Sequence, residues 1–393
     1  LPLLATTALD VETGNYIATF APSAFDNAGI TFSEAGTWQF KAQFTSTANF
    51  NAANTPNYDD ALTPRLTIKD GAGYAILVVG SLDDTTGSAA GLGEGQIEHT
   101  KTMDFVYKTL VDRGFAHDDI WYMSEPVGAI LPPPVFDGNP VVVDDTTPSQ
   151  ADLQRRITSW APGKMNAQPA PLYLVAIDHG LEGKFYVFNS STGFGEQRIV
   201  TPQELDGWYD TLQLNLDGVR GDATLNQAAD QDLVVVYGAC HSASFIPLMS
   251  APGRVLVASC QTAELSHRGA VDPLDGLRDG ELFVTEFFRE LRNGKKIKES
   301  FELASVRIES FTLSSSNGAD PDAVAPQRPV LDDDGNGTGH LADELVVEGS
   351  ADGARSSNVS LGFGVSNPGD SVGLLSATPT ITLAANGVLP TLT

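Results

Sequence analysis

The chain has 393 residues, of which 41% are hydrophobic, and 50 acidic against 23 basic side chains give a formal net charge of −27. This length is sufficient for a large core and more than one domain. The acidic balance argues against a nucleic-acid partner, because binding to phosphates depends on basic side chains. No apolar stretch approaches the roughly 18 residues of a membrane-spanning helix. Two cysteines are too few for a disulfide framework.

The beginning of the chain bears on its location. No signal peptide is visible, and the first residue is Leu1 rather than methionine, which suggests either that an export signal has been removed or that the sequence starts at a chosen boundary. We therefore expect a secreted or cell-surface protein, and we expect it to be a monomer.

Residues 1–73 alternate apolar and polar side chains, as strands with one buried face do. Tyr16, Ala18 and Phe20 share one face of a strand, and the segment GTWQFKAQF at 36–44 repeats the pattern. Glycine, asparagine, proline and serine separate the strands. We predict a small β-rich module without catalytic residues.

From residue 74 to 310, continuous apolar runs alternate with amphipathic segments. The predicted strands are 75–80, 119–126, 172–178, 233–239 and 254–259, and the predicted helices are 96–113, 147–160, 201–216, 281–292 and 296–309. Strands buried on both faces have such continuous runs. The alternation predicts an α/β domain with a mainly parallel sheet and helices on both faces. Residues 311–393 are expected to form an Asp/Gly-rich loop and a β-rich tail.

Two of the apolar runs lead directly into reactive side chains. His179 and Gly180 follow one strand, and Cys240 follows the other. Ligand sites of such sheets lie beyond the carboxyl ends of the strands. A thiol attacks an acyl carbon as the thiolate, so it needs a base, and the resulting oxyanion needs N–H donors. Either residue alone would more often be structural, but together they favour catalysis, with His179 as base and the Gly180 and Cys240 N–H groups as donors.

This pairing resembles the caspase-like superfamily of cysteine peptidases, and its legumain branch in particular. The motif residues are Gly80 and Ser81, Asp178 to Gly180, and Ser242 to Ser244. The resemblance covers about residues 74–310. It implies a caspase-like fold and a secreted cysteine endopeptidase that acts on proteins or peptides without a catalytic cofactor. It also implies synthesis as a zymogen, with candidate processing loops at 132–147 and 314–329.

The resemblance also implies roles for residues around the catalytic pair. Gln96 takes the place of an asparagine that orients the catalytic histidine. The pocket lining would include Glu98, His99 and Asp178, and the substrate-strand contacts would be Ser259, Gln261, Thr262 and Glu264.

Two positions depart from the legumain pattern. Glu98 stands where legumains have an arginine, and Gly238 stands where they have an acid. A carboxylate at the pocket wall favours a basic substrate residue before the cleaved bond, Arg or Lys, with Asn or Asp as the alternative.

Two other functions remain open for the same residues. One is a transpeptidase or ligase that transfers the acyl group to an amine. The other is an inactive caspase-like domain that serves as a binding module.

The segment LDDDGNGTGH has the ligand spacing of a calcium loop. Asp332, Asp334, Asn336, Thr338 and Asp343 occupy the first, third, fifth, seventh and twelfth places. The glutamate expected at the twelfth place is absent, and no paired helices are predicted. The alternatives are therefore a structural Ca²⁺ site and a solvated turn.

Overall fold

The computed structural model describes most of the central part of the chain and a few strands at its two ends. The described ranges are 72–80, 95–127, 135–136, 139–168, 170–187, 199–217, 232–314, 326–345 and 351–362, with strands at 8–10, 15–19, 36–39, 43–44, 53–54, 65–68, 380–384 and 391–392. Ser81, Phe20 and parts of both candidate processing loops lie outside them. The chain divides into two compact units, residues 1–70 with 372–393, and residues 71–371.

The first unit combines strands from both ends of the chain. Its main sheet has the order β1-β2-β18-β19, made of β1 (Ala8–Asp10), β2 (Asn15–Thr19), β18 (Thr380–Ala384) and β19 (Thr391–Leu392). Two further pairs are β3 (Gly36–Gln39) with β6 (Arg65–Ile68) and β4 (Gln43–Phe44) with β5 (Ala53–Asn54). The described residues of segments 1–70 and 372–393 are thus strands, and strands from both segments share one sheet.

The second unit is built on a six-stranded sheet with the order β17-β16-β15-β11-β7-β8. Its strands are β7 (Tyr74–Val79), β8 (Ile120–Met123), β11 (Leu172–Ile177), β15 (Leu233–Gly238), β16 (Arg254–Ala258) and β17 (Val330–Asp332). All neighbours are parallel except β17, which is antiparallel to β16. The predicted mainly parallel sheet is confirmed. The strand β17 lies within the region that was expected to be loop, because three residues carry no periodic signal.

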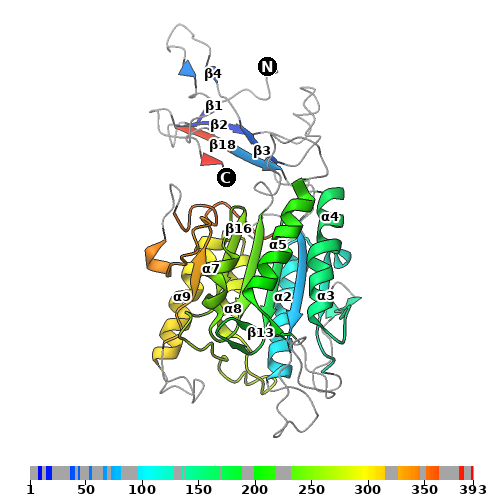
Figure 1. Ribbon diagram of the computed structural model, residues 1–393. Coiled ribbons are helices and arrows are strands. Elements are labelled where there is room, and N and C mark those ends of the chain that lie inside the picture. Colours follow the sequence, from blue (N-terminus) through cyan, green and yellow to red (C-terminus); the bar gives the residue numbers. More distant parts are fainter. Residues whose placement is uncertain are drawn as a thin grey trace, which may run out of the picture. The chain divides into compact units, whose positions relative to one another are not determined.

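Helices cover both faces of this sheet (Figure 1). One face packs against α2 (Gln96–Asp112), α8 (Leu282–Arg292) and α9 (Ile297–Leu313). The other packs against α3 (Gln150–Arg155), α4 (Ala161–Ala167), α5 (Pro202–Asp217) and α7 (Ile246–Met249). A π-helical turn, Arg156–Trp160, joins α3 to α4, so this helical segment extends beyond the predicted end at Trp160.

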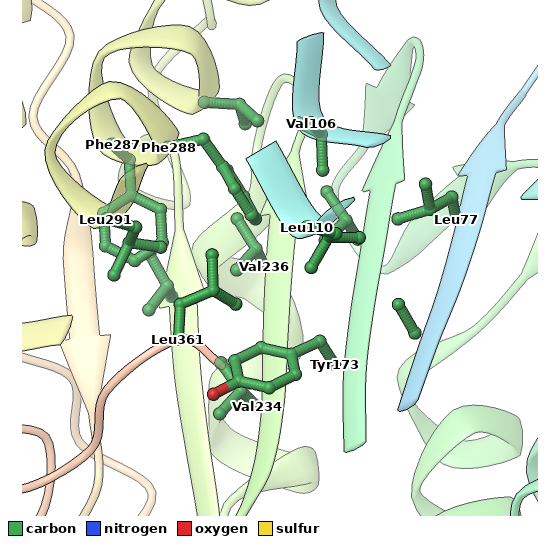
Figure 2. Packing of buried hydrophobic residues seen from close by; sticks show 14 of the residues in the cluster. Leu77, Val106, Leu110, Tyr173, Val234, Val236, Phe287, Phe288, Leu291 and Leu361 are labelled. Atoms are coloured by element: carbon green, nitrogen blue, oxygen red, sulfur yellow. The ribbon is translucent and has the colours of Figure 1, made fainter. Parts of the chain in front are cut away.

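Successive side chains of each central strand enter the two cores in turn. Val234 and Val236 of β15 lie among residues of α2 and α8, as Figure 2 shows, whereas Leu233 and Val235 join the opposite core. Each such side chain contributes roughly 1.5–3 kcal/mol when it is withdrawn from water. Burial on both faces explains why these strands are continuous apolar runs in the sequence.

Side-chain caps fix where two helices begin. Thr201 and Glu204 form a capping box at the start of α5, in which each side chain accepts a hydrogen bond from the other residue's N–H. Helix α3 begins three residues after the predicted start at residue 147, and its cap is Ser149, whose Oγ accepts a hydrogen bond from Asp152 N. The hydroxyl directly before the first helical residue is the one positioned to reach the free N–H groups.

The strand order of the sheet reverses direction at β7. From β7 the chain continues to β8 on one side, and the next strand, β11, lies on the other side of β7. Ligands bind at such switch points, beyond the carboxyl ends of the strands. This edge carries the residues singled out in the sequence.

Candidate functional site

Two neighbouring strands bring His179 and Cys240 to the same edge of the sheet. Strands β11 and β15 are parallel, and Ile177 pairs with Gly238 at their carboxyl ends. His179 and Cys240 each lie two residues beyond this pair, so they leave the sheet at the same height. Gly180 lies against the second loop, because a Cβ built on it would stand 2.5 Å from the carbonyl oxygen of Cys240.

A short hairpin locks these two loops together. It consists of β12 (Gly180–Leu181) and β13 (Lys184–Tyr186), with β14 (Ile199–Val200) as a third strand. Ser244 Oγ accepts a hydrogen bond from Gly183 N at 2.9 Å and donates one to His241 O at 2.6 Å. The hydroxyl thus connects the histidine-bearing loop with the cysteine-bearing loop.

Cys240 is a partly exposed thiol in an environment that favours its neutral form. Burial raises the pKa of Cys240, and hydrogen bonding to Ser266 opposes this rise. Its Sγ lies 3.9 Å from Ser266 O and 3.8 Å from Ser266 Oγ. The following elements are a 3₁₀ turn, Ser242–Phe245, and the one-turn helix α7. With its pKa raised, the thiol needs a base to become a nucleophile.

The surroundings of His179 differ from the sequence expectation. The His179 ring lies edge-on to His99, with centroids 5.6 Å apart, and His99 Nδ1 lies 3.5 Å from Asp178 Oδ1. Gln96, expected to orient His179, is buried, and its amide forms no hydrogen bond within the described part of the chain. Since Gln96 opens α2 and His99 lies one turn later, the ring beside His179 comes from this helix but from the later position.

Glu98 is already paired. Its Oε2 lies 3.0 Å from Arg268 NH1, and its Oε1 accepts a hydrogen bond from Arg278 N at 3.2 Å. The predicted preference for a basic substrate residue requires that the Glu98 carboxylate be unpaired, but Arg268 pairs with it. No local sequence pattern indicates this ion pair, because Arg268 lies 170 residues away in the sequence.

Of the four expected substrate-strand contacts, two brace the protein instead. Ser259 is fully buried, and its Oγ accepts a hydrogen bond from Ala239 N. Glu264 is held by Arg328, whose NH2 lies 2.6 Å from Glu264 Oε1. Gln261 is partly exposed and Thr262 exposed. These four residues follow a strand end, where sequence alone does not separate a bracing side chain from an exposed one.

Cys260 and His241, which lie close to Cys240 in the fold, form hydrogen bonds that support the cysteine-bearing loop. Cys260 is buried, and burial raises its pKa to about 12. Its Sγ donates to Ala239 O at 3.3 Å, as expected for a core thiol. His241 Nδ1 lies 2.7 Å from Thr262 O, so this ring is engaged with the neighbouring loop.

Sequence reasoning missed three residues at this edge: Ser266, Glu281 and Gln327. Glu281 is buried, caps α8 by accepting a hydrogen bond from Val284 N, and accepts another from Gln327 Nε2. A Cβ on Gly238 would stand 2.8 Å from Val284 Cγ2 and 3.1 Å from Glu281 Cγ, so both side chains pack into the space that the glycine leaves. An acidic residue just before an amphipathic helix indicates a helix cap. It does not indicate that the Glu281 side chain lies against Gly238, two residues before Cys240.

The acidic loop brings together a different set of carboxylates from the predicted one. Asp332 and Asp334 cluster with Asp352, and their ligand oxygens lie within 4.8 Å of one another. Asn336 and Thr338 are exposed, and Thr338 N donates to Asn336 Oδ1 within the turn. Asp343 is exposed on a 3₁₀ turn, Ala342–Glu344, and is not part of the cluster. The carboxylate cluster thus contains Asp352 and not Asp343, while the predicted ligand set as a whole stays a prediction.

Comparison with known proteins gave a match only at the level of structure. No protein-family model matches the chain, and no curated protein matches its sequence. The chain is similar to the crystal structure of caspase-1 from Spodoptera frugiperda, with 14% sequence identity and a TM-score of 0.40, over 67% of this chain and 87% of that chain. Among the described residues, none of the helices is both long and apolar enough to cross a membrane. So distant a likeness does not define an activity.

Proposed function

We propose that the protein is a cysteine endopeptidase with Cys240 as nucleophile and His179 as base. The observation that carries this proposal is the pairing of Ile177 with Gly238, which sets both residues at one height, with Gly180 against the Cys240 carbonyl. A nucleophile, a base and backbone donors at one sheet edge are the parts that acyl transfer requires.

The reaction follows from these positions. His179 removes the thiol proton of Cys240, and the thiolate attacks the carbonyl carbon of the peptide bond. The Gly180 and Cys240 N–H groups stabilise the oxyanion. His179 then returns the proton to the leaving amine as the C–N bond breaks, which leaves a thioester on Cys240. Water, deprotonated by His179, hydrolyses the thioester and restores the thiol.

Packing and hydrogen bonds account for the glycine and serine residues that the chain shares with the legumain motifs. A Cβ on Gly80 would stand 2.0 Å from Tyr186 O and 2.6 Å from Asp178 Cβ. Ser242 Oγ accepts a hydrogen bond from Cys260 N, and Ser244 joins the two loops. These contacts support a legumain-like arrangement around the dyad.

We propose that the substrate pocket presents the Arg268–Glu98 ion pair. The Arg268 side chain is 36% exposed and that of Glu98 17% exposed, so the guanidinium is the more accessible partner. It follows Ser266, which contacts Cys240, by two residues. A guanidinium donates hydrogen bonds to an amide or carboxylate oxygen, so Asn or Asp before the cleaved bond is favoured over Arg or Lys.

Substrate profiling tests this specificity. Fluorogenic peptides with Asn, Asp, Arg or Lys before the cleaved bond are compared on wild type, Arg268→Gln and Glu98→Gln. Arg268→Gln should lower kcat/KM for Asn and Asp by about tenfold or more, equivalent to a charged hydrogen bond of about 1.5–3 kcal/mol. Preferential cleavage after Arg or Lys by the wild type would contradict the assignment.

The activity itself is tested with Cys240→Ala and its buried counterpart Cys260→Ala. Peptide hydrolysis should be lost in the first variant and retained in the second. Adding an amine nucleophile separates a peptidase from a transpeptidase, since the latter yields the amide product. Absence of hydrolysis and transfer in the wild type, together with an unreactive Cys240 thiol, would instead support a binding module.

A further inference from the structure

Two segments that are distant from the catalytic dyad in sequence bring three carboxylates together. Asp332 ends β17 and Asp334 follows it, whereas Asp352 belongs to the segment 351–362. Their ligand oxygens all lie within 4.8 Å of one another. Asp332 is 1% and Asp352 2% exposed, so two of the three carboxylates are withdrawn from water.

The cluster contains a buried oxygen that lacks a partner. Asp332 Oδ1 accepts a hydrogen bond from Ser250 Oγ, but Asp332 Oδ2 is buried without any hydrogen-bond partner in the described part of the chain. Asp352 Oδ1 accepts from Asp333 N, and its Oδ2 lies 2.6 Å from His340 Nδ1. A buried carboxylate oxygen without a partner is costly unless a cation or donor satisfies it.

We propose that Asp332, Asp334 and Asp352 bind a divalent cation, with Ca²⁺ preferred. Hard carboxylate oxygens select Ca²⁺, Mg²⁺ or Mn²⁺ over metals that favour nitrogen or sulfur. Calcium tolerates irregular ligand sets from flexible loops, whereas Mg²⁺ demands a near-octahedral one. Asp352, twenty residues beyond the loop start, takes the place that the sequence pattern had given to Asp343.

The proposed cation would stabilise the loop that carries Cys240 through the residues that follow it in the chain. Ser250 Oγ, which donates to Asp332, also accepts a hydrogen bond from Gly337 N, and Ser250 directly follows α7. Helix α7 begins six residues after Cys240. Binding would thus fix β17, the acidic loop and α7 to one another. This coupling to catalysis rests on the proposed function, whereas cation binding does not.

Calcium titration of the whole chain tests the site. The protein is stripped with chelator, and its melting temperature is followed with added CaCl₂ or MgCl₂, while Tb³⁺ luminescence reports occupancy. At about 100 times Kd, calcium should raise Tm by roughly 3–4 °C. Asp352→Asn and Asp334→Asn should abolish the rise, and Asp343→Asn should retain it. Asp334 is partly exposed, so its variant remains informative if Asp352→Asn fails to fold.

The outcomes separate the site from the activity. Absence of a Tm rise in the wild type, or an undiminished rise in Asp334→Asn, overturns the site. Binding is measured in the Cys240→Ala background, so it is decided even if the peptidase proposal fails. In the active protein, chelation should reduce peptide hydrolysis and calcium should restore it. Binding without any effect on hydrolysis would overturn the coupling alone.

Discussion

Replacing Gly180 by alanine probes the contact between the two loops of the proposed dyad. The new Cβ would stand 2.5 Å from Cys240 O, 3.0 Å from Ala239 Cβ and 3.1 Å from the Tyr237 hydroxyl, whereas ordinary contacts begin at 3.4 Å. The loops must therefore separate by about 0.9 Å. Overpacking of this kind costs about 1–3 kcal/mol of stability. A displacement of about 1 Å in a catalytic geometry costs roughly 100-fold in rate.

The matched control is Gly207→Ala on the exposed side of α5, where a Cβ meets no atom within 4 Å. Neither glycine has a positive φ, so the comparison isolates the steric contact. We expect kcat/KM of Gly180→Ala to fall about 100-fold, and Gly207→Ala to keep full activity with a slightly higher Tm, because alanine is the better helix former. Activity of Gly180→Ala within threefold of wild type would refute the proposed contact.

Two further predictions concern Glu281 and Ser244, which lie close to the loop that carries Cys240. Burial raises the pKa of Glu281 to about 7 from an ordinary 4.5. The folded state thus holds a proton that the unfolded state has lost, and stability should fall by about 3 kcal/mol as the pH rises from about 4.5 to about 7. Glu281→Gln should flatten this part of the pH–stability curve measured by urea unfolding, even if the loss of one hydrogen bond lowers it throughout; an unchanged slope would contradict the assignment. Ser244→Ala removes the hydrogen bond from Gly183 N between the two loops and the hydrogen bond to His241 O within the cysteine-bearing loop, and should cost about 1–2 kcal/mol. It should also slow peptide hydrolysis, and unimpaired hydrolysis would show that the link is dispensable.

The sheet could be predicted because its strands are buried on both faces. The run from Leu233 to Val236 must be apolar at every position, and the same requirement holds from Leu172 to Val175. This pattern is local, and the order of strands and helices follows from it. The three-residue strand β17 was not predictable, since its only signal is its pairing with β16.

The candidate site likewise has residues that the sequence indicates and contacts that it does not. His179, Gly180 and Cys240 could be proposed from the sequence because they follow the ends of recognisable strands. The pairing of Glu98 with Arg268, the approach of Glu281 to Gly238, and the joining of Asp352 to Asp332 depend on contacts between distant segments. A charged residue indicates the specificity of a pocket only when its ion-pair partner is known, and the partner is identified only by the fold.

Covalent labelling of the reactive thiol with a peptide reagent tests the assignment of the nucleophile most directly. The protein is treated at pH 8 with a peptide that carries a thiol-reactive carbonyl group, and the modified cysteine is identified by mass spectrometry. We expect modification of Cys240 alone, much slower in His179→Ala, because the pKa of Cys260 is about 12 and its thiol is buried. Labelling of Cys260, or peptide hydrolysis by Cys240→Ala at the wild-type rate, would contradict the account.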